Sequence, residues 1–125
     1  MSDYISILIV EDDAIIALGL ELAVEDRGYV VVGPVATVAE ALALVAQGGI
    51  EGAVLDASLL DRDVGPVALQ LIENGIPFVV HTGVGLPAVL ARHYPDLPVM
   101  MKPNSPDKVV ARLLREIKIG RVRGH

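Results

Sequence analysis

The stretch that decides the fold is ISILIVEDD, at positions 5–13. Residues 5–10 are apolar except for one serine, which predicts a buried strand. Three acidic residues follow directly, at positions 11–13. Residues 14–26 then carry apolar side chains at a helical spacing, at Ile15, Leu18 and Leu22. The chain is therefore predicted to open with a strand, an acidic turn and a helix.

The same alternation of strand and helix repeats along the rest of the chain. Short apolar runs predict further strands at 29–35, 53–55, 77–81 and 99–101. Capping and turn residues predict helices between and after them, at 37–47, 64–74, 86–94 and from Ser105 onward. Apolar strands separated by helices indicate a parallel sheet covered on both faces. Because such crossovers are right-handed, we predict a doubly wound sheet of the α/β class.

The composition indicates one folded domain without disulfides. The chain has 125 residues, of which 53% are hydrophobic, enough for one core but not for two. We predict a single domain over residues 1–125, with its core at about 5–119. A short basic tail follows, with Lys118, Arg121 and Arg123. The chain has no cysteine, which excludes disulfides and thiolate chemistry.

The charge and the hydropathy pattern argue against nucleic-acid and membrane partners. The net charge of −6 disfavours a generic electrostatic grip on nucleic acid. No apolar run reaches the ~18 residues that a membrane span needs. The N-terminus lacks the basic and apolar segments of a signal peptide. We therefore expect a cytoplasmic protein.

Ionisable and hydroxyl side chains follow most of the predicted strands. In doubly wound sheets, ligands bind beyond the carboxyl ends of the strands. The side chains at those positions are Glu11, Asp12, Asp13, Asp56, Thr82 and Lys102. Asp13 is predicted to cap the helix that follows it. His81 is predicted to pack against a helix, because side chains alternate along a strand and it should point away from Thr82.

The chemistry of this set predicts a magnesium site beside a nucleophilic carboxylate. Clustered carboxylates repel one another unless a cation joins them, and Mg²⁺ favours oxygen ligands. Glu11, Asp12 and Asp56 are therefore predicted to bind Mg²⁺, which would also neutralise an arriving phosphoryl group. Lys102 would add a positive charge and Thr82 a hydrogen bond. The residues thus predict that Asp56 accepts a phosphoryl group and becomes an aspartyl phosphate.

Four short motifs lie in order, each at the end of a predicted strand. They are ILIVEDD at 7–13, VLD at 54–56, VHTG at 80–83 and MKP at 101–103. Through them the chain resembles the receiver domain of two-component response regulators, over essentially its whole length. The resemblance implies a CheY-like, flavodoxin-like (βα)5 fold with strand order 2-1-3-4-5.

The resemblance also implies a role for each metal-site residue. Asp56 would be the phosphoacceptor. Asp12 would contact Mg²⁺ directly, and Glu11 would do so through water. Ser58 would give its backbone carbonyl to the metal.

The resemblance implies that the chain is a signalling switch rather than an enzyme. It would catalyse its own phosphorylation and dephosphorylation slowly. Thr82 and Lys102 would bind the phosphoryl group, and the Lys102–Pro103 peptide bond would be cis. A histidine kinase or histidine phosphotransferase would donate the phosphoryl group. The chain would then dock on an unknown downstream protein, or serve as a phosphate sink. The implied surface for docking, and for a homodimer, comprises the helix at 86–94, the strand at 99–101 and the last helix.

The aromatic residues that usually report the phosphorylated state are missing. Residues 80–85 resemble an atypical subclass with a Phe-Ala-Thr-Gly-X-Tyr motif, but match it only at Thr82 and Gly83. Gly85 stands where that subclass carries tyrosine, and Val99 stands where other receivers carry tyrosine or phenylalanine. We therefore expect the signal to rely on rearrangement of residues 83–90.

Two other functions stay open. A phosphohydrolase of the haloacid-dehalogenase type also uses Asp, Thr or Ser, and Lys after parallel strands. Its nucleophile normally lies in an Asp-X-Asp motif, whereas this chain has Asp56-Ala57-Ser58. A receiver that binds its partner without phosphorylation is the other alternative, which the missing aromatic residues allow.

Overall fold

The computed structural model describes residues 4–122. Its five strands form one parallel sheet in the order β2-β1-β3-β4-β5, so the predicted strand order 2-1-3-4-5 is confirmed. The strands are β1 (Ser6–Val10), β2 (Val30–Val35), β3 (Gly52–Asp56), β4 (Phe78–Thr82) and β5 (Val99–Met101). The helices are α1 (Ala14–Asp26), α2 (Val38–Gln47), α3 (Gly65–Glu73), α4 (Ala88–His93) and α5 (Pro106–Val122). Arg123 of the predicted basic tail lies outside the described residues.

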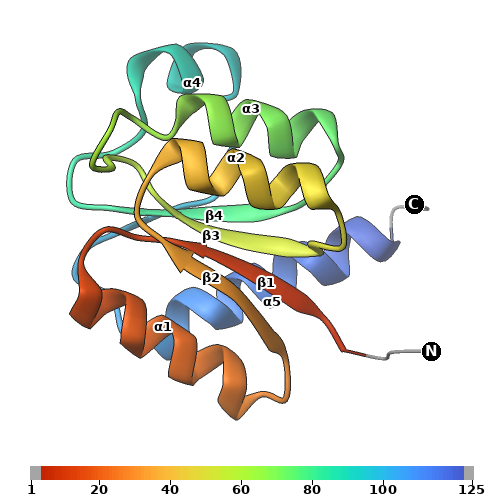
Figure 1. Cartoon of the computed structure of the whole chain (residues 1–125). Coiled ribbons are helices and arrows are strands. Elements are labelled where there is room, and N and C mark those ends of the chain that lie inside the picture. The colour runs from red at the N-terminus through yellow and green to blue at the C-terminus, as the bar shows by residue number, and fades with distance from the viewer. Residues whose placement is uncertain (1–3, 123–125) are drawn as a thin grey trace.

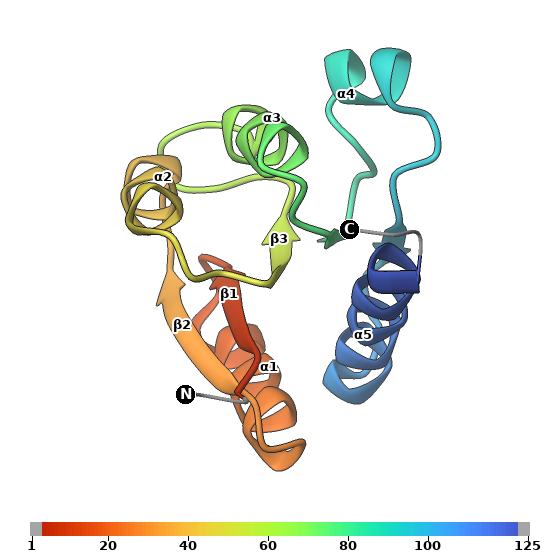
Figure 2. The same cartoon turned by 90° about the vertical axis from the view of Figure 1, so that its right-hand side faces the viewer.

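The helices cover both faces of the sheet, as the predicted doubly wound topology requires. Figures 1 and 2 show α1 and α5 against one face and α2 and α3 against the other, with α4 beside α3. Each face has its own apolar core, and side chains alternate between the two along every strand. Val54 and Val79 belong to the core under α1 and α5, whereas Leu55 and Val80 belong to the core under α2 and α3. β3 and β4 are therefore buried on both faces, and the ends of these strands have fixed positions.

The helix α1 is where it was predicted, but the side chains that marked it face solvent. Ile15, Leu18 and Leu22 are exposed by 84%, 54% and 52%. The buried stripe has the same spacing and comprises Ala17, Leu20 and Val24. Because both stripes are apolar, the spacing identifies the helix without showing which stripe meets the sheet. An apolar stripe thus lies on the surface of α1.

Three predicted helix starts are capped by the expected side chains. The Asp13 carboxylate accepts hydrogen bonds from the backbone N–H groups of Ile15 and Ile16, at 2.9 and 3.2 Å. The hydroxyls of Thr37 and Ser105 accept a backbone N–H at the starts of α2 and α5. These bonds satisfy N–H groups that have no partner within the helix.

Two peptide bonds are cis, Gly33–Pro34 and the predicted Lys102–Pro103. None of the helices in residues 4–122 is both long enough and apolar enough to cross a lipid bilayer.

Candidate functional site

Three carboxylates and one ammonium meet at the carboxyl edge of the sheet. Glu11 and Asp12 follow β1, Asp56 ends β3, and Lys102 follows β5. One carboxylate oxygen from each of the three acidic residues lies within 4.8 Å of the others. The Lys102 Nζ lies 3.2 Å from Glu11 Oε1 and 3.5 Å from Asp56 Oδ1. The structure thus brings together four of the predicted site residues, taken from three strands.

Burial and charge repulsion control the ionisation of this cluster. The Glu11 side chain is 1% exposed, and burial, with the neighbouring Asp56 carboxylate, raises the pKa of Glu11 to about 7. Burial alone would lower the pKa of Lys102, but its contacts with Glu11 and then Asp56 outweigh burial and raise that pKa. The ammonium is therefore held charged, and Glu11 is an acid that gives up its proton only near neutral pH.

The donor set fits a hard divalent cation. All three groups offer carboxylate oxygens, and a single ammonium faces them. Asp12 is exposed while Glu11 and Asp56 are buried, so an ion held here would keep part of its coordination open to solvent. Mg²⁺ prefers oxygen ligands of this kind, together with waters and phosphate oxygens.

The loop after β3 makes two backbone hydrogen bonds near the phosphoacceptor candidate. The Ser58 backbone N–H lies 3.5 Å from Asp56 Oδ1, and the Val64 N–H donates to the Ala57 carbonyl at 2.9 Å. Ser58 itself is exposed. The metal role of its carbonyl stays a prediction.

Thr82 is buried at the same edge, but its hydroxyl serves the loop between β4 and α4. It donates to the Gly85 carbonyl at 3.2 Å and accepts the Val84 N–H at 3.0 Å. The Thr82 carbonyl in turn accepts the Lys102 backbone N–H at 2.7 Å. Both hydrogen bonds of the hydroxyl are thus made to the loop that follows β4, within residues 83–90, and the sequence spacing did not reveal this link.

Asp61 has a structural role that was not predicted. Its carboxylate accepts the backbone N–H groups of Val38 and Ala39, at 2.8 and 3.2 Å, and so caps α2 from another loop. These hydrogen bonds lower the pKa of Asp61, and the bond from Val38 has the largest effect. The contact joins residues more than twenty positions apart, so no local capping pattern could have identified it.

His81 is buried, as predicted, with 3% of its surface exposed. Burial lowers the pKa of His81, and the Lys102 ammonium lowers it further. Both ring nitrogens lack a hydrogen-bond partner, and no other buried side-chain nitrogen or oxygen among residues 4–120 does.

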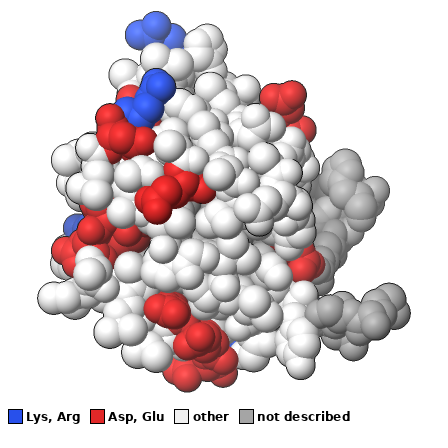
Figure 3. Space-filling model, in the orientation of Figure 1, with Lys and Arg blue, Asp and Glu red and all other residues white. Residues whose placement is uncertain are grey.

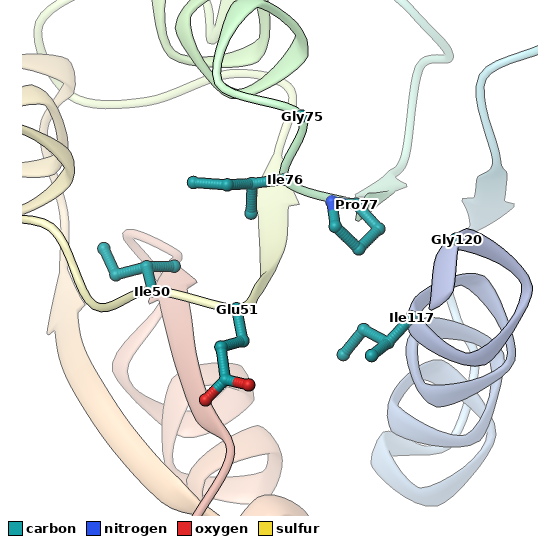
Figure 4. A pocket seen from close by; sticks show the side chains of 7 residues that line it. All are labelled: Ile50, Glu51, Gly75, Ile76, Pro77, Ile117 and Gly120. Carbon is teal, nitrogen blue, oxygen red and sulfur yellow. The ribbon is translucent and has the colours of Figure 1, made fainter. Parts of the chain in front are cut away.

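Acidic side chains are not confined to the site. Figure 3 shows many more acidic than basic side chains on this face, gathered mainly on the side toward which the strands run in Figure 1. Figure 4 shows a pocket at the opposite edge, where β3 and β4 begin. Its lining comprises Ile50, Glu51, Gly75, Ile76, Pro77, Ile117 and Gly120. It holds none of the predicted site residues, and ligands of such sheets bind at the other edge.

Comparison with solved structures identifies the family. The chain is 40% identical to SdrG from Sphingomonas melonis Fr1, over 94% of this chain and 99% of that chain, with a TM-score of 0.78. It is 42% identical to the BeF3-activated conformation of SdrG from Pseudomonas melonis Fr1, over 94% and 98% of the two chains, with a TM-score of 0.70.

A more distant structure has the same fold. It is a CheY-like response regulator receiver domain protein from Methanospirillum hungatei JF-1, 23% identical over 98% of this chain and 100% of that chain, with a TM-score of 0.85. A scan against family models and a search of curated proteins found no match. The sheet order, the acidic edge and the 40% identity over nearly the full length agree, and the chain belongs to the response regulator receiver domains.

Proposed function

We propose that Asp56 accepts a phosphoryl group from the phosphohistidine of a kinase or phosphotransferase, and that the chain acts as a signalling switch. The observation that carries this proposal is the Lys102 ammonium placed between Glu11 and Asp56, with Asp12 in the same cluster. An Asp56 carboxylate oxygen attacks phosphorus, and the P–N bond of the donor breaks. The electron pair stays on the donor imidazole, which takes a proton from solvent.

The metal ligands in this proposal are Glu11, Asp12, Asp56 and the Ser58 carbonyl. When bound, Mg²⁺ supplies positive charge to the phosphoryl oxygens and screens the carboxylates from one another. Glu11 must lose its proton for the full ligand set to form, because its pKa is about 7. Metal binding is therefore expected to release a proton at neutral pH.

Lys102 and Thr82 have separate tasks in the proposed reaction. The ammonium of Lys102 already contacts Asp56 at 3.5 Å, so a short movement would bring it to a phosphoryl oxygen. The Thr82 hydroxyl can donate only one hydrogen bond, and at present it donates to Gly85. A phosphoryl group that attracts this hydroxyl would therefore remove one of its two bonds to the loop.

The choice of the Thr82 hydroxyl between Gly85 and a phosphoryl group could signal phosphorylation without an aromatic residue. Gly85 has a φ of 91°, a conformation open to glycine, and a side chain there would meet nothing within 4 Å. Val84 beside it is 83% exposed. We propose that loss of the Thr82–Gly85 bond lets residues 83–90 rearrange, and that a downstream protein reads the change at the adjacent α4–β5–α5 surface. A homodimer through that surface belongs to the same proposal.

The surroundings of the site favour a protein donor. The three most exposed large apolar side chains among residues 4–120 are those of Ile15, Val84 and Leu60, at 84%, 83% and 71%. They come from α1 and from the loops after β4 and β3, which are the segments around the acidic edge. Exposed apolar side chains on the segments beside a site offer contacts to a protein that docks there. A protein that carries a phosphohistidine would reach Asp56 while covering these three side chains, and we propose that the reaction takes place in the cytoplasm.

The comparison with SdrG supports the same assignment. A conformation of SdrG is described as BeF3-activated, and beryllium fluoride has the shape and charge of a phosphoryl group. We extend that behaviour to Asp56 of this chain. Membership of the atypical subclass is a further proposal. It rests on Thr82 and Gly83, and on the likeness of residues 75–79 and of residues 64–68 with Pro66 to that subclass.

Intact-mass spectrometry tests the proposal. Incubation with phosphoramidate or acetyl phosphate and Mg²⁺ should add one phosphoryl group to the native chain. Asp56→Asn should abolish the gain, whereas Asp63→Asn, a change of the same kind in the next loop, should retain it. A chain that gains no phosphoryl group from these donors or from a kinase would instead favour a phosphorylation-independent binding module.

Turnover of p-nitrophenyl phosphate would instead revive the phosphohydrolase alternative. The expected result is a single adduct that hydrolyses slowly, with no turnover of p-nitrophenyl phosphate.

A further inference from the structure

His81 lies directly beside the phosphoacceptor in the sheet. β3 and β4 pair in parallel with Asp56 opposite His81, and β4 and β5 pair with His81 opposite Met100. Val54 and Val79 both face the core under α1 and α5, so Asp56 and His81, each two residues further on, face the same side. Neighbouring strands are ~4.8 Å apart. The imidazole is therefore the lateral neighbour of the reacting carboxylate.

The imidazole is placed there without a hydrogen bond. It is 3% exposed, and neither Nδ1 nor Nε2 has a partner. Burial and the nearby ammonium of Lys102 lower the pKa of His81, while Asp56 raises it. The ring has at least one N–H donor in either protonation state. Unpaired buried polar groups are costly and rare, and this one adjoins the proposed site of chemistry.

Three other roles for the ring fail on its position. It is outside the group of side chains that could share one ion, which comprises Glu11, Asp12 and Asp56. It is buried, so a partner protein does not contact it. In hydrolysis, water attacks phosphorus in line with the bond that breaks, from the side opposite Asp56. His81 lies within the sheet beside Asp56, so it is not the base for that water. Asp56 is the site residue beside which the strand register places the ring.

We propose that His81 is a positioning residue whose N–H stabilises the Asp56 carboxylate as the phosphoryl group leaves; this inference rests on the proposed function. In the hydrolysis step, water oxygen attacks phosphorus and the P–O bond to Asp56 breaks. The electron pair stays on the Asp56 oxygen, and the proton of the water goes to the phosphate product. Negative charge thus returns to the carboxylate in the transition state, where an aligned donor is most effective.

The unpaired ring in this state agrees with that role. Without a phosphoryl group, the Lys102 ammonium contacts Asp56 Oδ1 at 3.5 Å and already serves the carboxylate. A phosphoryl group would draw the ammonium toward its own oxygens. His81 would then be the adjacent buried donor on the side of Asp56 that faces α1 and α5, and a rotation of the ring would direct its N–H to the carboxylate.

The half-life of the phosphorylated chain tests the inference. The native chain is loaded with phosphoramidate and Mg²⁺, the donor is removed, and the decay is followed by intact mass. His81→Leu should lengthen the half-life about tenfold, the effect of one lost hydrogen bond to a charged group. His81→Asn keeps an N–H donor and should decay at close to the native rate. His93→Leu, which removes an exposed histidine, should not change the decay.

Two further measurements separate this role from simple packing. His81→Leu should raise the melting temperature while it slows hydrolysis, because it replaces unpaired polar atoms by apolar ones. The ring ¹⁵N–¹H signals of His81, unlike those of His93, should shift when BeF3⁻ and Mg²⁺ are added.

Equal half-lives for the native chain and His81→Leu, or an Asn variant as slow as the Leu variant, would overturn the inference. Ring signals that BeF3⁻ does not move would do the same. A native chain that never gains a phosphoryl group would overturn the proposed function first, and this inference with it.

Discussion

Glu11→Gln is expected to stabilise the metal-free domain at alkaline pH. Burial and Asp56 raise the pKa of Glu11 from 4.5 to about 7, so the folded chain holds this proton more tightly than the unfolded chain. The contribution of the protonated form is fully present below pH 4.5 and is lost as the pH rises through about 7. The difference between the two pKa values corresponds to about 3 kcal/mol. Glutamine has the shape of the protonated acid and cannot ionise, so it should retain this stability.

Urea unfolding in EDTA measures the effect. At about pH 5 the native chain and Glu11→Gln should differ little, and at about pH 8 the variant should be more stable by up to about 3 kcal/mol. Glu73→Gln removes an exposed carboxylate and is the matched control. Mg²⁺ should narrow the difference at pH 8, because it binds the ionised native site. A variant that is no more stable than the native chain at pH 8 would refute the account of the buried cluster.

Three other changes test separate contacts. Lys102→Met removes the cation that favours ionised Glu11. The pH midpoint of the Glu11 carboxyl in a ¹³C NMR titration should therefore rise above its native value. An unchanged midpoint would show that the ion pair does not affect the ionisation of Glu11. Thr82→Val removes both hydrogen bonds between the hydroxyl and the loop, each of which contributes about 1 kcal/mol to stability. The amide hydrogen of Val84 should therefore exchange with solvent at least tenfold faster. Unchanged protection of this amide in the variant would exclude the proposed loop contact. Asp61→Ala should lower the melting temperature at neutral pH and reduce the loss of stability in acid. The hydrogen bonds to Asp61 lower its pKa, so their contribution is present above its ordinary pKa of 3.8 and is lost as the pH falls through the lowered pKa of the folded state. Equal acid unfolding curves for the two chains would argue against the cap.

The fold was predictable because its signals are local and repeated. Each strand is an apolar run of its own, and the caps Asp13, Thr37 and Ser105 lie within one turn of the helices they begin. The exposed stripe of α1 was not predictable, because Ile15 and Leu20 both lie on apolar stripes of helical spacing. Only the packing of the helix on the sheet distinguishes them.

The acidic site was predictable for a different reason. Parallel strands place their carboxyl ends at one edge, so Glu11, Asp56 and Lys102 had to converge once the topology was known. Contacts that depend on the paths of loops could not be predicted from the topology. Asp61 reaches a helix from another loop, and the Thr82 hydroxyl bonds the loop after its own strand. The position of each depends on backbone conformations that residue types do not specify.

His81 shows most clearly which features of the site a sequence pattern cannot predict. The alternation of side chains predicted its burial correctly. Its place beside Asp56 depends on the register of β3 and β4, which a sequence pattern does not give. The absence of a partner for its ring nitrogens depends on every neighbouring side chain.

Chemical trapping of the modified residue tests the central claim most directly. After incubation with phosphoramidate and Mg²⁺, borohydride reduces an acyl phosphate to an alcohol, so a phosphorylated aspartate becomes homoserine. Peptide mass spectrometry should then find homoserine at position 56 in the native chain, and nowhere in a sample treated without Mg²⁺. Homoserine at position 12, 13 or 63 instead, or no homoserine in a chain that has gained a phosphoryl group, would contradict the assignment of Asp56 as the phosphoacceptor.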